Sequence, residues 1–538
     1  MMTSFLLGIF LVGMSCEASG KIPDATSIVP ADDSVYLLLE KLQITDDLVH
    51  SILDQNNLSE REVYRLLKSA KFRMSPDSSL YAWVSDELRR LTDRLCGGNS
   101  FHTPESIRFY FDSSNSARPI RNNGLGSTTG TYDSLHSHEN GARFFNGRQL
   151  SAQTAVTAQA GGFFAARIEP RFESEWMSSA HQSEIFLRRA NFNFTFRNVE
   201  LVIGRDDWRW GPIPEGGLLA GTSARPIDQL RLSSSRPFRF PGFFRHVGPM
   251  KYSVFFANTG PHRVNDYSWI FGWKANIAPS RFFEFGFGRS MIFGGKNAPR
   301  VSTVNFFREA FSKPKNFGDK SKGESRGTNT TDQRWNLDFK VRIPVGVPFN
   351  WYNEFAVDDS RNALFLSFKN FKYYVQDQVA VKSGLFFPQI FDGRLSMRIE
   401  YLKIPAIFYR HSIWRDGYIL SGGNIGGTFG SDSRSGKLAF EWAASRFRSL
   451  SASFAYVLRT GDNYKQFDPA PGGIKRVTVV TNRPNEHAYI IESNARWELS
   501  SSWIARADLG LELARNYEFE ADRNRTLYRL GSGLEFKF

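Results

Sequence analysis

The last twelve residues of the chain, 527–538, alternate between two kinds of side chain. One series is apolar or aromatic apart from a single serine: Tyr528, Leu530, Ser532, Leu534, Phe536 and Phe538. The other series is charged or glycine: Arg529, Gly531, Gly533, Glu535 and Lys537. Because strand side chains point alternately to two faces, this stretch predicts a strand with one apolar face. Membrane-spanning strands of about ten residues have this pattern. A terminal Phe resembles the assembly signal of bacterial outer-membrane barrels. A half-buried strand of a soluble sheet would show the same alternation. Only repetition of the pattern elsewhere in the chain can distinguish the two.

The same alternation recurs upstream. It is clearest in segments 192–196, 283–287, 335–343, 395–401, 489–499 and 503–513. Their apolar faces are rich in Phe and Trp, whereas their polar faces carry full charges in almost every segment. A soluble sandwich would bury its apolar faces against each other, but a barrel with lipid outside and water inside needs this combination. We therefore predict an all-β transmembrane barrel of antiparallel strands over residues 105–538.

The overall composition agrees with a barrel and restricts the partners. Mean hydropathy is −0.36, as expected when strands average an apolar and a polar face. A net charge of +14 favours anionic partners. Nucleic acid is not expected, because Arg and Lys are spread through the alternating strands instead of clustering in one patch.

The N-terminus predicts export. Residues 5–14 form an apolar run too short to span a bilayer and followed by small residues, which indicates a signal peptide over 1–18, cleaved after Ala18. A lipid anchor at Cys16 is the alternative, although Gly-Met-Ser-Cys is a poor lipobox. Cleavage would leave Cys96 as the only cysteine, so no intramolecular disulfide is expected. Export without a further apolar helix, together with the strand pattern, predicts the outer membrane.

Residues 32–98 differ from the rest of the chain. Apolar residues recur there at helical spacing in four stretches, around 35–42, 48–53, 63–70 and 80–95. Ser59 and Glu62 form a candidate capping box, and Gly97 follows the last stripe. We predict a small helical module on the periplasmic end of the barrel, since it is too small to be very stable alone. A plug or docking module and a stabilising cap are equally compatible with the pattern.

Polar segments predict long extracellular loops. Residues 313–332 and 422–436 are poor in apolar side chains. His136, His138 and Glu139 lie close together in another polar stretch, but two histidines without further ligands do not indicate a metal site. No metal or cofactor is expected.

A dense series of Gly, Trp, Arg and Pro interrupts the alternation between residues 201 and 249. It reads Gly204-Arg-Asp-Asp-Trp-Arg-Trp-Gly-Pro212, then Gly217-Leu-Leu-Ala-Gly-Thr-Ser-Ala-Arg-Pro226, then Gly248-Pro249. This series resembles the capsule assembly (Wzi-type) family of outer-membrane barrels. The sequence departs from the family pattern in placing Arg209 between Trp208 and Trp210, and in having Gly221-Thr222 where the family favours Ser or Asn.

The resemblance implies a barrel of about eighteen strands, a periplasmic helical bundle and a lectin-like role in attaching or organising capsular polysaccharide. The side chains suit such a role, because Trp rings stack on sugars and guanidinium groups bind carboxylates through paired hydrogen bonds. The candidate polysaccharide-binding residues are Arg205, Asp206, Asp207, Trp208, Arg209, Trp210 and Arg225. An inward-folded constriction loop held by its own ion pairs would use the same residues.

Two other functions remain alternatives. An outer-membrane hydrolase would need a nucleophile beside a base, and the chain has no Gly-x-Ser-x-Gly motif and no evident His–Ser constellation. A porin-like channel for solutes or oligosaccharides would share the alternating strands, but the helical module argues for an obstructed pore. We therefore expect a non-enzymatic, monomeric outer-membrane protein whose partners are acidic polysaccharide and membrane lipid.

Overall fold

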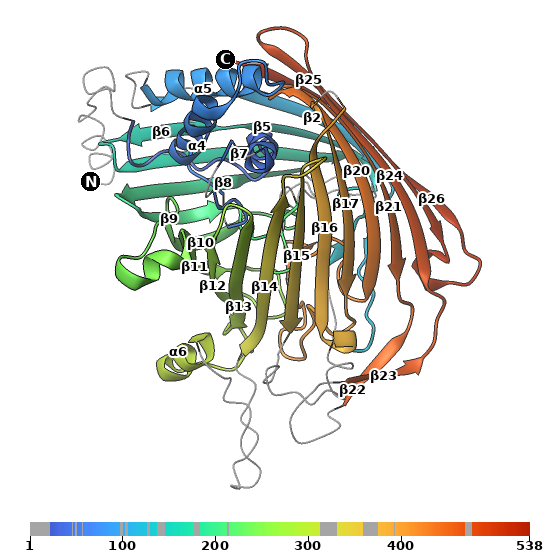
Figure 1. Ribbon diagram of the computed structural model, residues 1–538. Coiled ribbons are helices and arrows are strands. Elements are labelled where there is room, and N and C mark those ends of the chain that lie inside the picture. Colours follow the sequence, from blue (N-terminus) through green and yellow to red (C-terminus); the bar gives the residue numbers. More distant parts are fainter. Residues whose placement is uncertain are drawn as a thin grey trace, which may run out of the picture.

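The computed structural model is a closed antiparallel barrel of 18 strands (Figure 1). It describes residues 22–45, 47–48, 51–55, 57–96, 101–102, 106–125, 130–136, 146–176, 183–211, 215–311, 331–358, 375–391, 393–467 and 476–538. The spanning strands of the first half are β2 (Ser106–Ser114), β5 and β6 (Gly147–Thr154, Val156–Ala160, one interrupted strand), β7 (Phe164–Trp176), β8 (Ser183–Phe196), β9 (Val199–Asp206), β10 (Ile227–Ser234), β11 (Met250–Asn258), β12 (Trp269–Ile277) and β13 (Phe283–Phe293). Those of the second half are β14 (Thr331–Ile343), β15 (Phe349–Asp358), β16 (Val379–Ile390), β17 (Leu395–Ile404), β20 (Ser433–Ser445), β21 (Arg448–Arg459), β24 (Glu486–Glu498), β25 (Trp503–Arg515) and β26 (Arg525–Lys537).

The first and last spanning strands close the ring. β26 pairs with β2, so that Phe536 lies opposite Ile107 and Arg529 opposite Ser114. The short β1 (Phe101–His102) pairs with β6 beside this seam. The predicted terminal strand and the predicted barrel are therefore confirmed.

The barrel wall is apolar outside and charged inside. On β26, Leu530 is 52% exposed on the outer face, whereas the neighbouring Arg529 is 4% exposed. The largest fully buried side chains include Arg189, Arg231 and Arg334, which a soluble core would rarely contain. This is the arrangement that lipid outside and a polar lumen impose on alternating strands.

The two ends of the barrel differ in their connections. At one end the strands are joined by short turns, such as 197–198, 344–348 and 446–447, with the 3-10 helix η2 (Gly242–Val247) in a longer one. At the other end the connections are long, including 115–146, 207–226 and 405–432. Outer-membrane barrels keep short turns in the periplasm and long loops outside the cell. We call the two ends the short-turn end and the long-loop end.

The long loops carry small elements of their own. These are β3 (Arg118–Pro119), β4 (Thr131–Tyr132), α6 (Thr303–Phe311), β18 (Ile419–Leu420), β19 (Gly423–Asn424), β22 (Asn463–Phe467), β23 (Arg476–Thr481) and η5 (Tyr517–Phe519). The predicted loop 422–436 begins in this region, but Ser433 already starts β20. Of the predicted loop 313–332, residues 313–330 lie outside the described part of the chain, and Thr331 starts β14.

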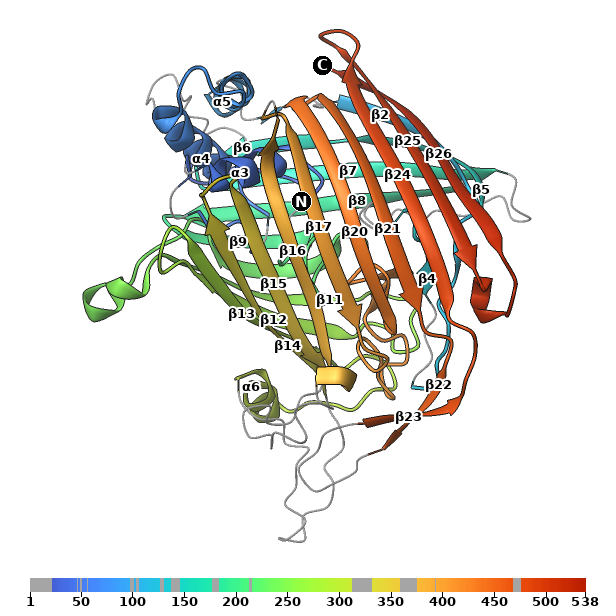
Figure 2. The same cartoon turned by 45° about the vertical axis from the view of Figure 1, so that its right-hand side comes forward.

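Three helices lie together at the short-turn end: α3 (Val35–Ile44), α4 (Glu60–Arg73) and α5 (Tyr81–Cys96) (Figure 2). Their apolar stripes form one core with Leu38, Leu67 and Trp83. None of the described helices is long and apolar enough to cross a membrane. The signal peptide predicted over 1–18 lies outside the described residues.

Two details of the helical prediction are wrong. Residues 51–54 are buried but not helical, because their backbone pairs with the 207–226 loop: Gln55 bridges Trp210. Ser59 is the N-cap of α4, but its side chain makes no capping hydrogen bond. Glu62 instead accepts two hydrogen bonds of 2.7 Å from Arg65, so an ion pair replaces the expected capping box.

The lumen is filled from both ends. From the short-turn end, the N-terminal segment 22–58 enters the barrel, and Lys340 on β14 contacts Asp54 at 2.6 Å. From the long-loop end, the 207–226 loop folds inward, and Glu354 on β15 accepts a 2.8 Å hydrogen bond from the Leu218 N–H. Gly217 allows this approach, since a Cβ there would clash with the carboxylate of Glu354. The two segments meet where the Ala31 N–H donates to Asp207 at 2.9 Å.

Candidate functional site

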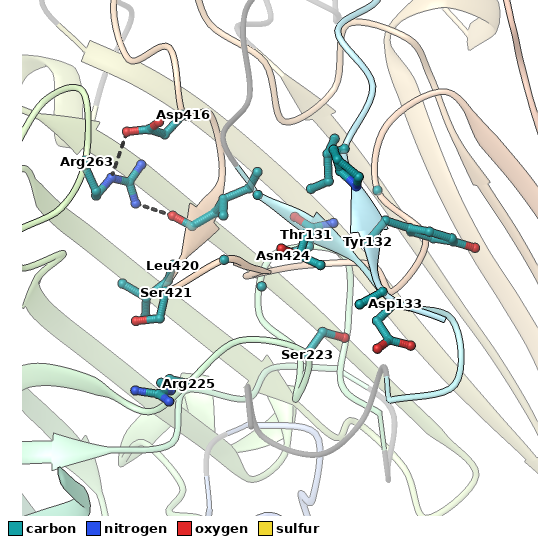
Figure 3. A pocket seen from close by; sticks show the side chains of 18 of the residues that line it. Thr131, Tyr132, Asp133, Ser223, Arg225, Arg263, Asp416, Leu420, Ser421 and Asn424 are labelled. Carbon is teal, nitrogen blue, oxygen red and sulfur yellow. Dashed lines mark hydrogen bonds and ion pairs between the residues drawn. The ribbon is translucent and has the colours of Figure 1, made fainter. Parts of the chain in front are cut away.

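A cavity of about 840 Å³ opens among the long loops. Its wall combines the 115–146 loop, the start of β8, the end of β9, the start of β10 and the 405–432 loop. Figure 3 shows Tyr132 and Asp133 on one side, Arg225 below, and the β18–β19 hairpin with Leu420 and Asn424 between them and Arg263. We call this space the long-loop cavity.

Arginine is the main charged residue of this cavity. Eight arginines line it: Arg118, Arg121, Arg188, Arg205, Arg225, Arg263, Arg410 and Arg459. Five carboxylates accompany them: Asp133, Glu184, Asp228, Asp416 and Asp432. The lining residues alone therefore carry more positive than negative groups, while Glu486 and Glu512 behind the wall pair with Arg118, and Glu486 also pairs with Arg459.

Most of these guanidinium groups are held by neighbours on the wall. Arg263 donates a 3.0 Å hydrogen bond to the Gly417 carbonyl and another to the Ile419 carbonyl, and it contacts Asp416 at 3.7 Å. Burial lowers the pKa of Arg263, although Asp416 opposes this effect. A guanidinium fixed in this way presents its remaining face without a loss of side-chain freedom on binding.

Arg225 and Arg205 stand at the β9–β10 side of the cavity. Arg225 lies over the ring of Phe186, 4.0 Å from its centre, and contacts Glu173 at 3.3 Å. Arg205 makes two hydrogen bonds to Asp228, of 2.7 and 2.8 Å, and its side chain is 36% exposed. The structure therefore places both of these predicted binding residues on the wall of the cavity.

Arg121 and Arg410 lie together in one corner of the long-loop cavity. Among the described residues, the hydrogen-bond acceptors of Arg121 are neutral: the Thr460 and Asp462 carbonyls and the Asn463 amide oxygen. Arg410 donates 2.7 Å hydrogen bonds to the Ser431 hydroxyl and the Arg121 carbonyl. Burial lowers the pKa of Arg410 to about 10.

Asp432 is a carboxylate of this cavity whose charge interacts with both Arg410 and Arg121. Burial raises its pKa to about 6, although a hydrogen bond from Tyr464 and the charges of Arg410 and Arg121 oppose this. The Tyr464 hydroxyl donates to it at 3.3 Å. The corner therefore gains negative charge as the pH rises through about 6.

The other predicted binding residues lie behind the cavity, in the lumen. Trp210 is fully buried and Trp208 is 6% exposed, and both pack against Phe255. Arg209 lies over the Tyr36 ring of α3, 4.8 Å from its centre. This part of the loop therefore folds inward, as in the constriction-loop alternative, but its contacts here are to rings of other segments and not ion pairs within the loop.

Asp206 and Asp207 belong to the same buried layer. Asp206 accepts a 3.0 Å hydrogen bond from Arg231, and Asp207 contacts Arg189 at 2.9 Å. Neither carboxylate lines the long-loop cavity. The motif thus divides in two: its ends, Arg205 and Arg225, reach the cavity, and its middle ties the loop to the wall.

Arg121, Arg263 and Arg410 are cavity residues that the sequence patterns do not mark. They lie in loops without periodicity, and the polar composition of the 422–436 stretch is the only signal of this region. His136, predicted to be an ordinary loop residue, is buried, with its ring nitrogens 3.0 Å from Asp112 and 2.8 Å from Asp133. His138 and Glu139 lie outside the described residues.

Comparisons with known proteins address the family. The family model of the capsule assembly protein Wzi matches residues 120–528. A solved structure of Wzi from Escherichia coli, described as an outer-membrane protein involved in group 1 capsule assembly and a carbohydrate-binding β-barrel, has the same fold. The TM-score is 0.65 at 18% identity, covering 96% of this chain and 100% of that one.

A relative identified by sequence similarity is also linked to a cps region by its description. The uncharacterized 55.8 kDa protein in the cps region of Klebsiella pneumoniae is 23% identical over 327 residues, or 59% of this chain. The alignment spans 55% of the length of that relative. Because the family model covers most of the barrel, the chain belongs to the capsule assembly protein Wzi family of outer-membrane β-barrels.

Proposed function

We propose that this protein binds an acidic capsular or surface polysaccharide in the long-loop cavity and thereby helps to attach or organise the capsule at the cell surface. The main support is the excess of arginine on the wall of that cavity, above all the Arg121–Arg410 corner. Carboxylates of uronate or pyruvyl groups are the natural ligands of fixed guanidinium groups. The Escherichia coli relative, itself described as a carbohydrate-binding barrel, adds support from the family.

The rings at the cavity suit a sugar chain. Phe186 and Phe429 line the wall and are only partly buried. Aromatic rings beside charged groups offer apolar contact to the C–H face of a sugar, while the arginines bind its acidic substituents. Asn424 and Ser421 line the same cavity and add neutral hydrogen-bonding groups to it (Figure 3).

Affinity is expected to come from many weak contacts. An exposed ion pair contributes about 0–1 kcal/mol, so a single arginine matters little. A polymer that engages the cavities of many neighbouring copies gains through multivalency. Binding should therefore weaken steeply with salt and only slightly when one exposed arginine is lost.

The decisive experiment compares an acidic polysaccharide with the same polymer after its carboxyl groups have been reduced to alcohols. Purified barrel in detergent should bind the acidic polymer much more tightly than the reduced one. The double variant Arg121→Gln/Arg410→Gln should lose most of this preference. Arg523→Gln is the matched control, because Arg523 is exposed on the β25–β26 connection of the same end and its described side-chain contacts are local: Glu518, Glu520 and the Tyr517 ring.

Equal binding of the two polymers would overturn the preference for acidic glycans. Failure of the folded protein to bind either polymer would overturn the polysaccharide role itself. In cells, the double variant should assemble normally but release capsule into the medium.

A further inference from the structure

Two more cavities lie deeper in the barrel, of about 390 and 230 Å³. The larger opens at the short-turn end between the helical module and the wall, where Arg90 and Arg94 of α5 line it. The two cavities adjoin each other, since the same five residues line both: Ala31, Asp32, Glu441, Ser451 and Asn494. We call them together the inner cavity.

The inner cavity exists because one side of the wall carries small side chains. Ala439 on β20 lies opposite Ser453 on β21, and both face the lumen, as does Ser451. On the other side, the lumen is filled by large residues such as Trp210 and Tyr352. The segments that enter the lumen therefore pack against one half of the ring and leave space along the other.

The lining of the inner cavity is polar and carries both signs of charge. Its middle part has carboxylates on Asp32, Glu441 and Glu492 and cationic groups on Arg398, Lys437 and Arg529. A space of this size with many hydrogen-bonding groups holds water. Such a lining solvates small ions of either sign.

The inner cavity and the long-loop cavity are separated by two thin turns. In the first, Leu135 lines only the inner cavity, whereas His136 lines both. In the second, Thr222 lines the inner cavity and its neighbour Ser223 lines the long-loop cavity. At each turn the separation is therefore about one residue thick.

Polar contacts from three strands hold the first turn in place. His136 is fixed between Asp112 on β2 and Asp133 of the turn. Arg529 on β26 donates a 2.9 Å hydrogen bond to the Leu135 carbonyl and another of 2.9 Å to Asp112. The Ser134 hydroxyl donates to Glu512 on β25. The turn is thus held by side chains and not by a strand ladder.

We propose that the two cavities form a conduit for small inorganic ions along the β20–β24 side of the barrel, with the 133–136 turn as its gate. The helical module and the 207–226 loop fill the rest of the lumen, so the conduit is the remaining aqueous path between the two ends in the described residues. With the turn in place the conductance is small. Removing the His136 ring joins the two cavities and raises it.

Planar-bilayer recordings of the full-length protein in KCl test this proposal. His136→Ala should conduct severalfold more than the parent. Ser453→Trp should narrow the conduit, lower the parent conductance and cancel the increase in the double variant. Ser493→Trp is the matched control, because Ser493 lies opposite Leu509 on the outward face of the wall, where a Trp meets lipid. Each variant is first checked for folding by heat-modifiable migration on gels.

If His136→Ala does not fold, Ser134→Ala replaces it, since it removes only the hydrogen bond to Glu512. A folded gate variant that conducts no more than the parent would overturn the proposal. So would an increase that Ser453→Trp leaves unchanged, because the ions would then follow another path. Polysaccharide binding can fail or persist independently of either result.

Discussion

The backbone N–H of Gly211 donates a 2.8 Å hydrogen bond to the carbonyl oxygen of Asp54. Gly211 belongs to a loop that enters from the long-loop end, and Asp54 to a segment that enters from the short-turn end. Gly211 has a φ of +92°, which glycine adopts without strain. The contact joins the N-terminal segment to the 207–226 loop inside the lumen, so neither segment is an independent cover.

Deleting residues 32–98 should therefore open the barrel and also disturb the long-loop end. The intact protein is expected to conduct ions poorly, and the deletion variant should show large conductance steps in planar bilayers. Polysaccharide binding should fall as well, because the 207–226 loop loses its support. A large open conductance of the intact protein would contradict the plug and favour a porin.

Arg189→Met should strongly destabilise the barrel. The Arg189 guanidinium is buried and lies 2.8 Å from Glu169, 2.9 Å from Asp207 and 3.1 Å from Asp32. Removing one member of a buried charge cluster costs about 3–5 kcal/mol, because Glu169 and Asp207 stay buried with one cationic partner fewer. Denaturant unfolding in detergent measures this, with Arg523→Met as the exposed control. Equal stabilities would mean that the neighbouring arginines and the water of the inner cavity compensate for the loss of Arg189.

The affinity for an acidic polysaccharide should fall as the pH rises from 5 to 7.5. Burial raises the pKa of Asp432 to about 6, so the carboxyl group is neutral at pH 5 and adds a negative charge beside Arg410 and Arg121 above pH 6. One such charge nearby changes affinity on the order of fivefold. Titration calorimetry at both pH values measures the change.

Asp432→Asn should remove this part of the pH dependence while keeping the shape of the side chain. Comparing it with the parent separates Asp432 from His136 and His262, which also line the cavity. The same pH dependence in both proteins would assign the titration to another group.

Trp210→Ala should reduce stability more than it reduces binding. The ring is fully buried and stacks edge-on against Trp208, with ring centres 5.3 Å apart. Replacing a buried Trp by Ala costs about 3–5 kcal/mol. Unfolding and polysaccharide binding should be measured on the same preparation. A variant of normal stability that no longer binds would show that this ring contacts sugar after all.

Phe538→Asp should lower assembly into the outer membrane. The terminal residue is 66% exposed beside Phe536, at the seam where β26 meets β2. A charged side chain there would lie at the apolar end of the strand that closes the barrel, and the lipid-facing surface disfavours charge. The fraction of heat-modifiable protein in membrane fractions measures assembly. Undiminished assembly would argue against a role for this residue in closing the ring.

The sequence predicts the wall much better than the filling of the lumen. β14 and β26 follow directly from period-two alternation, because lipid and water impose it residue by residue. The helices α4 and α5 follow from apolar spacing, because their stripes face one shared core. Segment 51–54 does not, since its conformation depends on Trp210, a partner far away in the chain.

The candidate site shows the same limit. Arg205 and Arg225 can be identified because they belong to a family-like motif, yet Trp208 and Trp210 in that motif face the interior. A motif gives residue types, but it does not tell which side of a folded loop reaches solvent. Arg121 and Arg410 meet only through the tertiary packing of two loops, and no local pattern records that contact.

The cluster around Arg189 also bears on how such a protein can diverge. Its three carboxylates come from the N-terminal segment, from β7 and from the 207–226 loop. A substitution in one segment is tolerated only with a compensating change in another, so these three segments are expected to evolve together. Arg205, by contrast, has a local and exposed partner in Asp228. The rim of the cavity can therefore change its ligand from one lineage to the next while the interior stays the same.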